Sequence, residues 1–237
     1  MCGIVGAIAD RDISSVLING LKRLEYRGYD SAGIAVLDQQ SCIQRVRTTG
    51  KIKQLEEALN ATPANGNTGI GHTRWATHGI PSENNAHPHV CKKSIAVVHN
   101  GIIENFESLR EEQRSQDYEF TSDTDTEVIV HQLHKHFYSG NNLFDSVRKT
   151  VAELEGAYAL GVISTDEPGC LVAARRGSPL VIGIGDGENF IASDMSALLS
   201  ETNRFIILDE GDIALITKEK VTVFDTDNNE VKRTVHE

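Results

Sequence analysis

The sequence predicts an α+β fold in which two packed β-sheets are covered by helices on the outside. Up to Leu154, runs of small and β-branched residues alternate with segments whose apolar residues recur every three or four positions, as in strands and amphipathic helices. From Tyr158 onward, short apolar runs recur at about ten-residue spacing, separated by Gly, Asp and Asn, which is typical of antiparallel strands. Packed layers within one domain are the simplest way to bury the apolar faces of both kinds of element.

The N-terminal part is predicted to begin with a strand over residues 4–8, which are apolar and rich in small and β-branched side chains. A helix follows, in which apolar residues recur at spacings of three and four, namely Ile13, Val16, Leu17, Leu21 and Leu24. Arg27-Gly28 ends this pattern. Further expected elements are strands over residues 32–37 and 43–46, a short helix over 52–59 and a Pro/Gly/Asn-rich loop over 62–71.

The central part is predicted to contain a buried strand followed by amphipathic helices. The strand covers residues 95–98 and is expected to end in a turn, because His99-Asn100-Gly101 follows it. Asp123 and Thr124 precede the second helix, where capping residues are expected. The predicted helices cover residues 106–113, 127–137 and 143–154. The predicted C-terminal strands cover residues 159–163, 171–174, 180–184, 190–192, 205–208, 213–216 and 221–224.

Composition and charge exclude several classes of protein. The chain has 237 residues, of which 39% are hydrophobic, enough to bury a core without disulfides or a structural metal. Its 23 basic and 34 acidic residues give a net charge of −11. A general nucleic-acid binder or a protein that binds anionic membranes should carry the opposite charge. We therefore expect no nucleic-acid partner and no membrane partner.

The cysteines and the N-terminus indicate a soluble cytoplasmic protein. Cys2, Cys42, Cys91 and Cys170 are scattered without a CxxC pair, which is typical of free thiols in a reducing compartment. The N-terminal residues lack the basic region of a secretory signal. No apolar run approaches the roughly 18 residues that a membrane span requires.

Cys2 is a candidate nucleophile. An initiator methionine is normally removed before a small side chain, which would make Cys2 the N-terminal residue. A free α-amine has a pKa of about 7.7–8.0, so it can act as base toward the thiol of the same residue without a histidine. The alternative is that a cysteine at this position simply belongs to a buried first strand.

Two other segments carry groups suited to catalysis or binding. The Asn100 amide and the Gly101 N–H could together hold an oxyanion, although Asn-Gly is also the commonest hairpin pair. The segment over residues 72–79, HTRWATHG, contains Arg74, which could bind a carboxylate, and Trp75, which could close over a small ligand. This segment could equally be a polar surface loop with a packing tryptophan.

Two histidine-rich segments suggest a metal site but supply no complete ligand set. His87 and His89 lie in NAHPH, and His131 and His134 would share one face of a helix. No acidic or cysteine ligand has an evident place beside them. We therefore expect a solvated helix face at His131 and His134, and no metal and no cofactor.

Six motifs occur in the same order as in one protein family. They are LEYRGYDSAG (24–33), HTRWATHG (72–79), NAHPH (85–89), HNGIIEN (99–105), TDTE (124–127) and GSPLVIG (177–183). Together with the N-terminal MCGIVG, they resemble the class II, or N-terminal nucleophile, glutamine amidotransferases. Within that class the sequences of these motifs are similar to those of the glutamine–fructose-6-phosphate aminotransferases, also called glucosamine-6-phosphate synthases. The resemblance implies a four-layer αββα sandwich with two largely antiparallel sheets.

The resemblance also implies a role for particular residues. Cys2 would be the nucleophile with its own α-amine as base, and Asn100 and Gly101 would form the oxyanion hole. Arg27 lies in the stretch that packs beside the nucleophile in this family. The residues implied in glutamine binding are Arg74, Thr77 and His78 for the α-carboxylate, Asp125 for the α-ammonium and Trp75 as a cover.

The implied activity is hydrolysis of L-glutamine to glutamate and ammonia through a Cys2 thioester. The chain is expected to be one amidotransferase domain over residues 1–237, with its core at about 2–216 and without the sugar-isomerase domains of the full enzyme. It should then make no amino sugar by itself. The full enzyme would be a homodimer through those domains, whereas this chain could be monomeric. A chain that keeps Met1 is expected to be inactive.

Three other functions stay open at this point. In a cysteine hydrolase, His78 or His99 would activate Cys2, and activity would persist with Met1 present. A non-catalytic module would bind glutamine without reaction at Cys2. The chain could also be the glutaminase domain of another class II amidotransferase.

Overall fold

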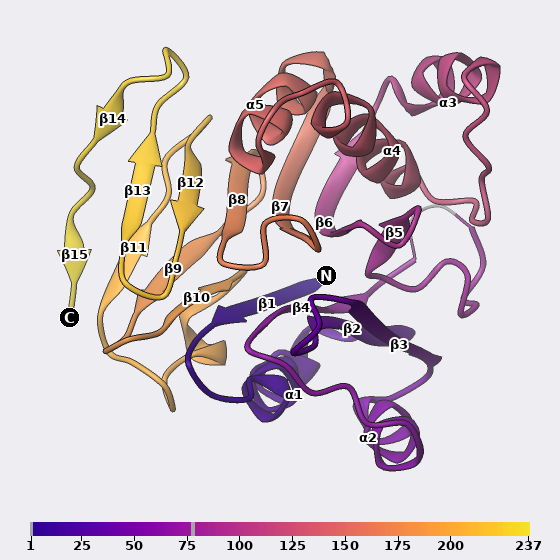
Figure 1. The fold of residues 1–237 in the computed structure, drawn as a ribbon. Coiled ribbons are helices and arrows are strands. Elements are labelled where there is room, and N and C mark those ends of the chain that lie inside the picture. Colours follow the sequence, from indigo (N-terminus) through magenta and orange to yellow (C-terminus); the bar gives the residue numbers. More distant parts are fainter. Residues whose placement is uncertain (1, 77–78) are drawn as a thin grey trace.

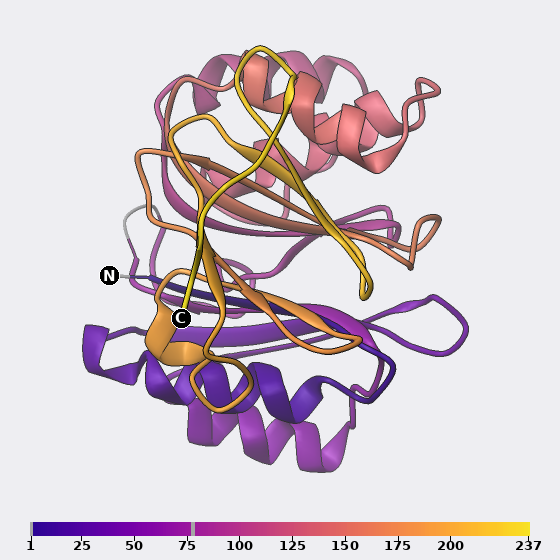
Figure 2. The same cartoon turned by 90° about the vertical axis from the view of Figure 1, so that its left-hand side faces the viewer.

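Two stacked β-sheets and the helices on their outer faces form four layers in the computed structural model, which describes residues 2–76 and 79–237 (Figures 1 and 2). The elements of the N-terminal part are β1 (Gly3–Ile8), α1 (Ser14–Arg23), η1 (Glu25–Arg27), β2 (Ser31–Leu37), β3 (Ile43–Thr49), α2 (Ile52–Ala61) and β4 (Thr68–Arg74). The central elements are β5 (His89–Cys91), β6 (Ile95–Ile103), α3 (Phe106–Ser115), α4 (Thr126–Phe137) and α5 (Leu143–Glu153). The C-terminal elements are β7 (Gly156–Ser164), β8 (Leu171–Arg176), β9 (Val181–Ile184), β10 (Asn189–Ala192), η2 (Met195–Ala197), β11 (Phe205–Ile207), β12 (Ile213–Ile216), β13 (Val221–Phe224), β14 (Glu230–Val231) and β15 (Val235–His236).

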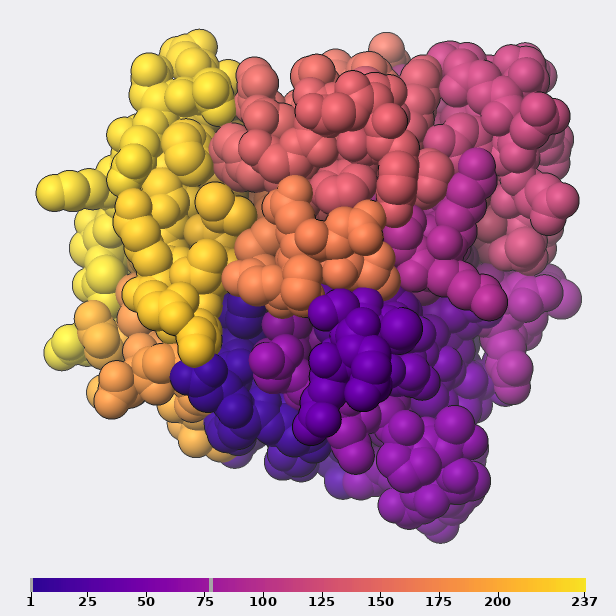
Figure 3. Space-filling model, viewed as in Figure 1, coloured from indigo at the N-terminus to yellow at the C-terminus, as the bar shows by residue number. Residues whose placement is uncertain are grey.

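The strand order brings distant parts of the chain together. In the described residues, one sheet has the order β15-β11-β9-β10-β1-β4-β2-β3 and the other β14-β13-β12-β8-β7-β6-β5. Neighbouring strands within these sheets pair antiparallel, as the sequence predicted. The strands near the C-terminus form one edge of the molecule, seen in yellow in Figure 3. The first strand, β1, lies inside its sheet between β10 and β4, and β6 lies between β5 and β7.

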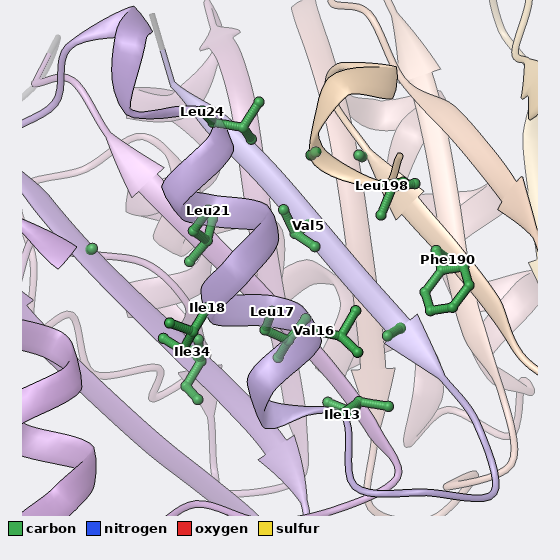
Figure 4. Close-up of a cluster of buried hydrophobic side chains, with 14 of the residues drawn as sticks. Val5, Ile13, Val16, Leu17, Ile18, Leu21, Leu24, Ile34, Phe190 and Leu198 are labelled. Carbon is green, nitrogen blue, oxygen red and sulfur yellow. The ribbon is translucent and has the colours of Figure 1, made fainter. Parts of the chain in front are cut away.

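The apolar core fills the spaces between the layers. On the outer face of the first sheet, Leu17 and Leu21 of α1 pack in one cluster with Val5 of β1 and with Phe190 and Leu198 (Figure 4). A second cluster lies between the sheets, and a third lies between the second sheet and helices α4 and α5. The helices therefore hold the outer face of each sheet while the two inner faces pack against one another.

The predicted loop over residues 62–71 is partly wrong, because β4 begins at Thr68. The glycines that suggested a loop are instead required by close packing of α1. A Cβ at Gly69 would lie 2.9 Å from Ile13 Cδ1, and a Cβ at Gly71 would lie 3.2 Å from Leu21 Cδ1. Glycine within a strand often marks such a close approach.

The predicted turn at Asn100-Gly101 is also wrong, since β6 continues through both residues to Ile103. Asn100 pairs with Ala159 and Gly101 with Tyr158 of β7. Gly101 has a φ of +132°, and a Cβ there would collide with the carbonyl oxygen of Ala157. The glycine thus permits a conformation inside the strand rather than a hairpin turn.

The caps predicted for α4 differ from the observed ones. The N-cap position is Asp125, and its side chain makes no capping hydrogen bond. Asp123 Oδ2 accepts a hydrogen bond from Asn85, and the hydroxyl of Thr124 contacts His89 Nε2. These side chains connect the segment before α4 to residues 85–89 instead of closing the helix end.

Helix α4 is also more buried than predicted. His131 and His134 are 4% and 8% exposed, so the expected solvated face is wrong. His131 contacts Cys91 Sγ and Glu119 O, and His134 Nδ1 contacts the Tyr118 hydroxyl at 2.9 Å. The helix lies between the second sheet and the segment around Tyr118, which covers the face that periodicity assigned to solvent. No helix in the described ranges combines the length and apolar character needed to cross a membrane.

Candidate functional site

An open cleft of about 630 Å³ lies at the N-terminal end of β1. Four of the residues singled out from the sequence line it, namely Cys2, Trp75, Asn100 and Gly101. They come from the ends of β1 and β4 in one sheet and from β6 in the other. Arg27 and Glu104 also line the cleft. The cleft therefore opens where the two sheets meet, and it is large enough for a small metabolite.

The pairing of β1 with β4 places Cys2 beside Trp75. Gly3 pairs with Thr73, so the residue before β1 lies next to the residues that end β4. The Trp75 backbone N–H donates to Cys2 Sγ at 3.2 Å, and the thiol lies 3.6 Å from the Trp75 carbonyl oxygen. Burial raises the pKa of the Cys2 thiol, while the Trp75 N–H lowers it in part. The thiol is therefore protonated at neutral pH and needs a base before it can act as a nucleophile.

Arg27 anchors the backbone of the nucleophile candidate. Its Nη1 donates to the Cys2 carbonyl oxygen at 3.4 Å and to Ser193 Oγ at 3.2 Å, and its Nη2 forms an ion pair with Asp194 at 2.7 Å. The same Ser193 hydroxyl accepts the Ile4 N–H at 3.1 Å. These contacts join the start of β1 to the end of β10, so the Cys2 backbone is held from two sides.

Asn100 points its amide nitrogen toward Cys2. The Nδ2 group donates to the Cys2 carbonyl oxygen at 3.3 Å, and Oδ1 lies 3.0 Å from His72 Nε2. Asn100 is 7% exposed. A largely buried amide donor directed at the nucleophile residue is a suitable stabiliser of negative charge that develops there.

Arg74 is held at the end of β4 by an acidic residue that the sequence analysis did not single out. Its Nη1 lies 4.0 Å from Asp30 Oδ1, and its Nη2 donates to the Gly79 carbonyl oxygen at 3.3 Å. Asp30 Oδ2 also accepts the Ala76 N–H at 2.5 Å. The Asp30 backbone N–H donates to the Arg74 carbonyl oxygen at 2.8 Å, so Asp30 fixes the backbone on both sides of Trp75. Its position in the LEYRGYDSAG motif was the only feature of the sequence that could have indicated this role.

Asp125 contacts the end of β6, the strand that contains Asn100 and Gly101. It directly precedes α4, it is 4% exposed, and its Oδ2 accepts the Ile103 N–H at 2.8 Å. Among the residues that the structure describes, those lining the cleft include neither Arg74 nor Asp125. Both are buried next to residues that do line it. Thr77 and His78, also predicted to bind glutamine, lie outside the described residues.

His99 does not occupy the position of a base for Cys2. Its Nδ1 lies 2.9 Å from Thr126 Oγ1, and its Nε2 lies 3.4 Å from the Ala157 carbonyl oxygen. Both ring nitrogens therefore have partners other than the thiol. This geometry gives no support to a cysteine hydrolase in which His99 activates Cys2.

The histidine-rich segments do not gather into a metal centre within residues 2–76 and 79–237. No group of three or more His, Cys, Asp or Glu side chains in that part of the chain is arranged to hold an ion. His87 and His89 are instead buried and contact the hydroxyls of Thr126 and Thr124.

The chain is similar to known proteins over its whole length. A family model described as a glutamine amidotransferase domain matches residues 72–200. Proteins from Haemophilus influenzae and Pseudomonas aeruginosa named glutamine–fructose-6-phosphate aminotransferase (isomerizing) are each 59% identical, over 237 and 233 residues. The matches cover 100% and 98% of this chain but 39% and 38% of those relatives. The chain thus spans about two fifths of the length of these relatives.

The fold is similar to a solved amidotransferase structure. Glutamine phosphoribosylpyrophosphate amidotransferase from B. subtilis, complexed with ADP and GMP, superposes with a TM-score of 0.81 at 24% identity. The match covers 97% of this chain and 50% of that chain. This likeness confirms the predicted α+β class with two largely antiparallel sheets between helices.

Proposed function

The chain belongs to the glutamine amidotransferase domain family, and from this premise we propose that it hydrolyses L-glutamine to glutamate and ammonia through a thioester on Cys2. The observation that carries this proposal is the Cys2 thiol at the edge of an open cleft with the Asn100 amide directed at the same residue. The protonated thiol also fits the proposal, because it needs the base that a free α-amine of Cys2 would supply.

The proposed reaction proceeds in two steps. The α-amine of Cys2 takes the thiol proton, and the thiolate attacks the amide carbon of glutamine. The oxygen of the tetrahedral intermediate is stabilised by Asn100 Nδ2 and by the Gly101 N–H. The intermediate collapses as the α-ammonium returns the proton to the leaving nitrogen, which releases ammonia and leaves a γ-glutamyl thioester. A water molecule, deprotonated by the same amine, then releases glutamate and the free thiol.

The proposed binding groups match the two charged ends of an amino acid. Arg74 would hold the α-carboxylate with Thr77 and His78, and Asp125 would pair with the α-ammonium. Trp75 is 53% exposed, and its ring lies against Gly28 at the mouth of the cleft, which suits a side chain that covers a bound ligand.

In a full-length protein of the length of the relatives, we propose that the ammonia converts fructose 6-phosphate to glucosamine 6-phosphate. This is supported by the 59% identity to proteins named for that reaction. The parts of those relatives beyond the matched region would bind the sugar phosphate and form the homodimer. A cytoplasmic location is supported by the four free thiols, since disulfides are rare in reducing compartments.

Glutaminase activity and covalent labelling test the proposal together. Protein whose intact mass lacks Met1 is incubated with glutamine, and ammonia and glutamate are measured. A glutamine-like electrophile such as a γ-diazoketone is expected to abolish activity with one label, located on Cys2 by peptide mass spectrometry. Glutamine binding without turnover and without labelling would instead indicate a non-catalytic module.

A further inference from the structure

The Asn100 carboxamide bridges two residues, Cys2 on one side and His72 on the other. Asn100 Nδ2 donates to the Cys2 carbonyl oxygen at 3.3 Å, and Oδ1 lies 3.0 Å from His72 Nε2. His72 lies within β4 and is 1% exposed. It does not line the cleft described above. Its contact with the reaction would therefore pass entirely through Asn100.

The position of the His72 proton follows from a second contact of the same nitrogen. His72 Nε2 also lies 2.9 Å from the His99 carbonyl oxygen, which can only accept a hydrogen bond. Nε2 must therefore carry hydrogen. A donor at this point requires the oxygen of the Asn100 amide, not its nitrogen, to face His72. The nitrogen then faces Cys2, where it donates to the carbonyl oxygen, so the His72 donor and the Cys2 acceptor favour the same orientation of the amide.

Neighbouring residues keep His72 in this state. Its ring stacks on His87, with centroids 4.2 Å apart and an interplanar angle of 22°. His87 Nε2 lies 2.8 Å from Thr126 Oγ1, and the same hydroxyl lies 2.9 Å from His99 Nδ1. Burial lowers the pKa of His72 to about 3. The ring is therefore neutral at neutral pH, and its stacking on His87 fixes its plane. Its Nδ1 has no hydrogen-bond partner among the described residues.

We propose that His72 is a positioning residue for the oxyanion hole, holding the Asn100 amide so that its N–H rather than its oxygen meets the developing negative charge. This inference rests on the proposed glutaminase function. Without the His72 donor, only the contact with the Cys2 carbonyl oxygen sets the orientation of the amide, and in chains where the amide has turned, its oxygen would face the oxyanion and oppose it. The effect should appear in kcat, because the charge develops only in the transition state.

Substitution of His72 tests the proposal with matched variants. His72→Phe keeps a planar ring for stacking but removes the donor, and kcat for glutamine should fall by about 10- to 100-fold with KM within about threefold of wild type. His72→Gln places an amide N–H near the position of Nε2 and should restore most of the loss. Alkylation of Cys2 by iodoacetamide develops no oxyanion, so its rate should stay within about threefold in both variants.

A double-mutant cycle separates positioning from general damage. If His72 acts through Asn100, His72→Phe should cost less than about threefold in an Asn100→Ala background. Full additivity of the two losses would overturn the proposal, as would a wild-type kcat in His72→Phe. The control for removal of a buried histidine is His134→Phe in helix α4, whose kcat should remain within about threefold.

Folding and the parent activity are checked on the same samples. Thermal unfolding shows whether His72→Phe is folded, and if it is not, His72→Asn replaces it because its shorter amide fits the space but cannot reach Asn100. A wild-type kcat in His72→Asn would overturn the inference. Absence of glutaminase activity in wild-type protein lacking Met1 would overturn the proposed function instead.

Discussion

Cys2 and Cys91 lie in contrasting surroundings. Cys91 is 1% exposed, at the end of β5, and its Sγ lies 3.2 Å from His131 Nδ1. His131 Nε2 faces the Glu119 carbonyl oxygen at 3.1 Å, so it carries the proton and Nδ1 accepts from the thiol. Burial raises the pKa of Cys91 to about 12. The Cys2 thiol borders the open cleft, and its partner is the backbone of Trp75.

This difference shows that a cysteine next to a histidine is not sufficient for catalysis. The Cys91–His131 pair has the contact expected of a thiol and its base, but the thiol is only 1% exposed and burial keeps it neutral. The Cys2 thiol has no imidazole partner in the described part of the chain, yet it has access to a cleft and an amide donor beside it. A free α-amine on the same residue would complete the site.

The largest expected effect distinguishes the two cysteines directly. Cys2→Ala removes the nucleophile, so glutaminase kcat should fall at least about 10³-fold. Cys91→Ala should leave kcat within about threefold and lower the free energy of unfolding by about 1 kcal/mol, because a buried sulfur is lost. Steady-state assays and urea unfolding check both variants. A large loss of kcat in a well-folded Cys91→Ala protein would contradict the assignment.

The next effect concerns the amide beside Cys2. Asn100→Ala should lower kcat by about 10²–10³-fold, with little change in KM, because the donor acts on charge in the transition state. The matched control is Asn105→Ala in the same HNGIIEN segment, since the Asn105 side chain bonds to backbone groups at Glu153 and Glu155. Its kcat should remain within about threefold. A loss below tenfold for Asn100→Ala would count against the oxyanion role.

A smaller effect is expected at the residue proposed to bind the carboxylate. Arg74→Lys keeps the charge but loses the planar fork of donors, so KM for glutamine should rise about tenfold or more, with a smaller change in kcat. Arg47→Lys is the control, because Arg47 Nη1 donates to the carbonyl oxygens of Asn84 and Ala86 outside the cleft. An unchanged KM in Arg74→Lys would remove Arg74 from the binding site.

The smallest effect concerns the stability of the region around Cys91. Burial lowers the pKa of His134 to about 4, below the ordinary value of 6.5 that applies to the unfolded chain. Between these values the unfolded state binds more protons, so the neutral ring contributes stability that is complete above about pH 6.5 and is lost as pH falls toward 4. His134→Phe should flatten this dependence by up to about 1.4 kcal/mol per pH unit. Urea unfolding between pH 7 and pH 4 measures it, and unchanged slopes would contradict the assignment.

Periodicity predicted the position and type of most elements because their apolar patterns are set by local burial. Strand β4, which lies beside Cys2, was missed because its glycines allow the close approach of Ile13 and Leu21, which lie elsewhere in the sequence. Likewise, the Asn100-Gly101 pair predicts a turn, but the conformation of Gly101 depends on its close contact with Ala157 in β7. The burial of His131 and His134 depends on the segment around Tyr118, which periodicity within one helix does not report.

The same limit applies to the site. Cys2, Trp75, Asn100 and Gly101 were identified from motifs, and the structure brings them to one cleft. Asp30 and His72 lie in the same motifs but were not singled out. Their role is to position other residues of the site, and the sequence around them does not indicate such a role. Asp30 fixes the backbone at Ala76, and His72 fixes the Asn100 amide. Such support becomes visible only when strands from both sheets are placed together.

The most direct test of the central claim follows activity as Met1 is removed. Protein that carries Met1 is treated with a methionine aminopeptidase, and each time point is measured by intact mass and by glutamine hydrolysis. If the α-amine of Cys2 is the base, activity should be absent at the start and should rise in proportion to the fraction of chains that begin with Cys2. Full activity in protein that still carries Met1 would contradict the N-terminal nucleophile mechanism.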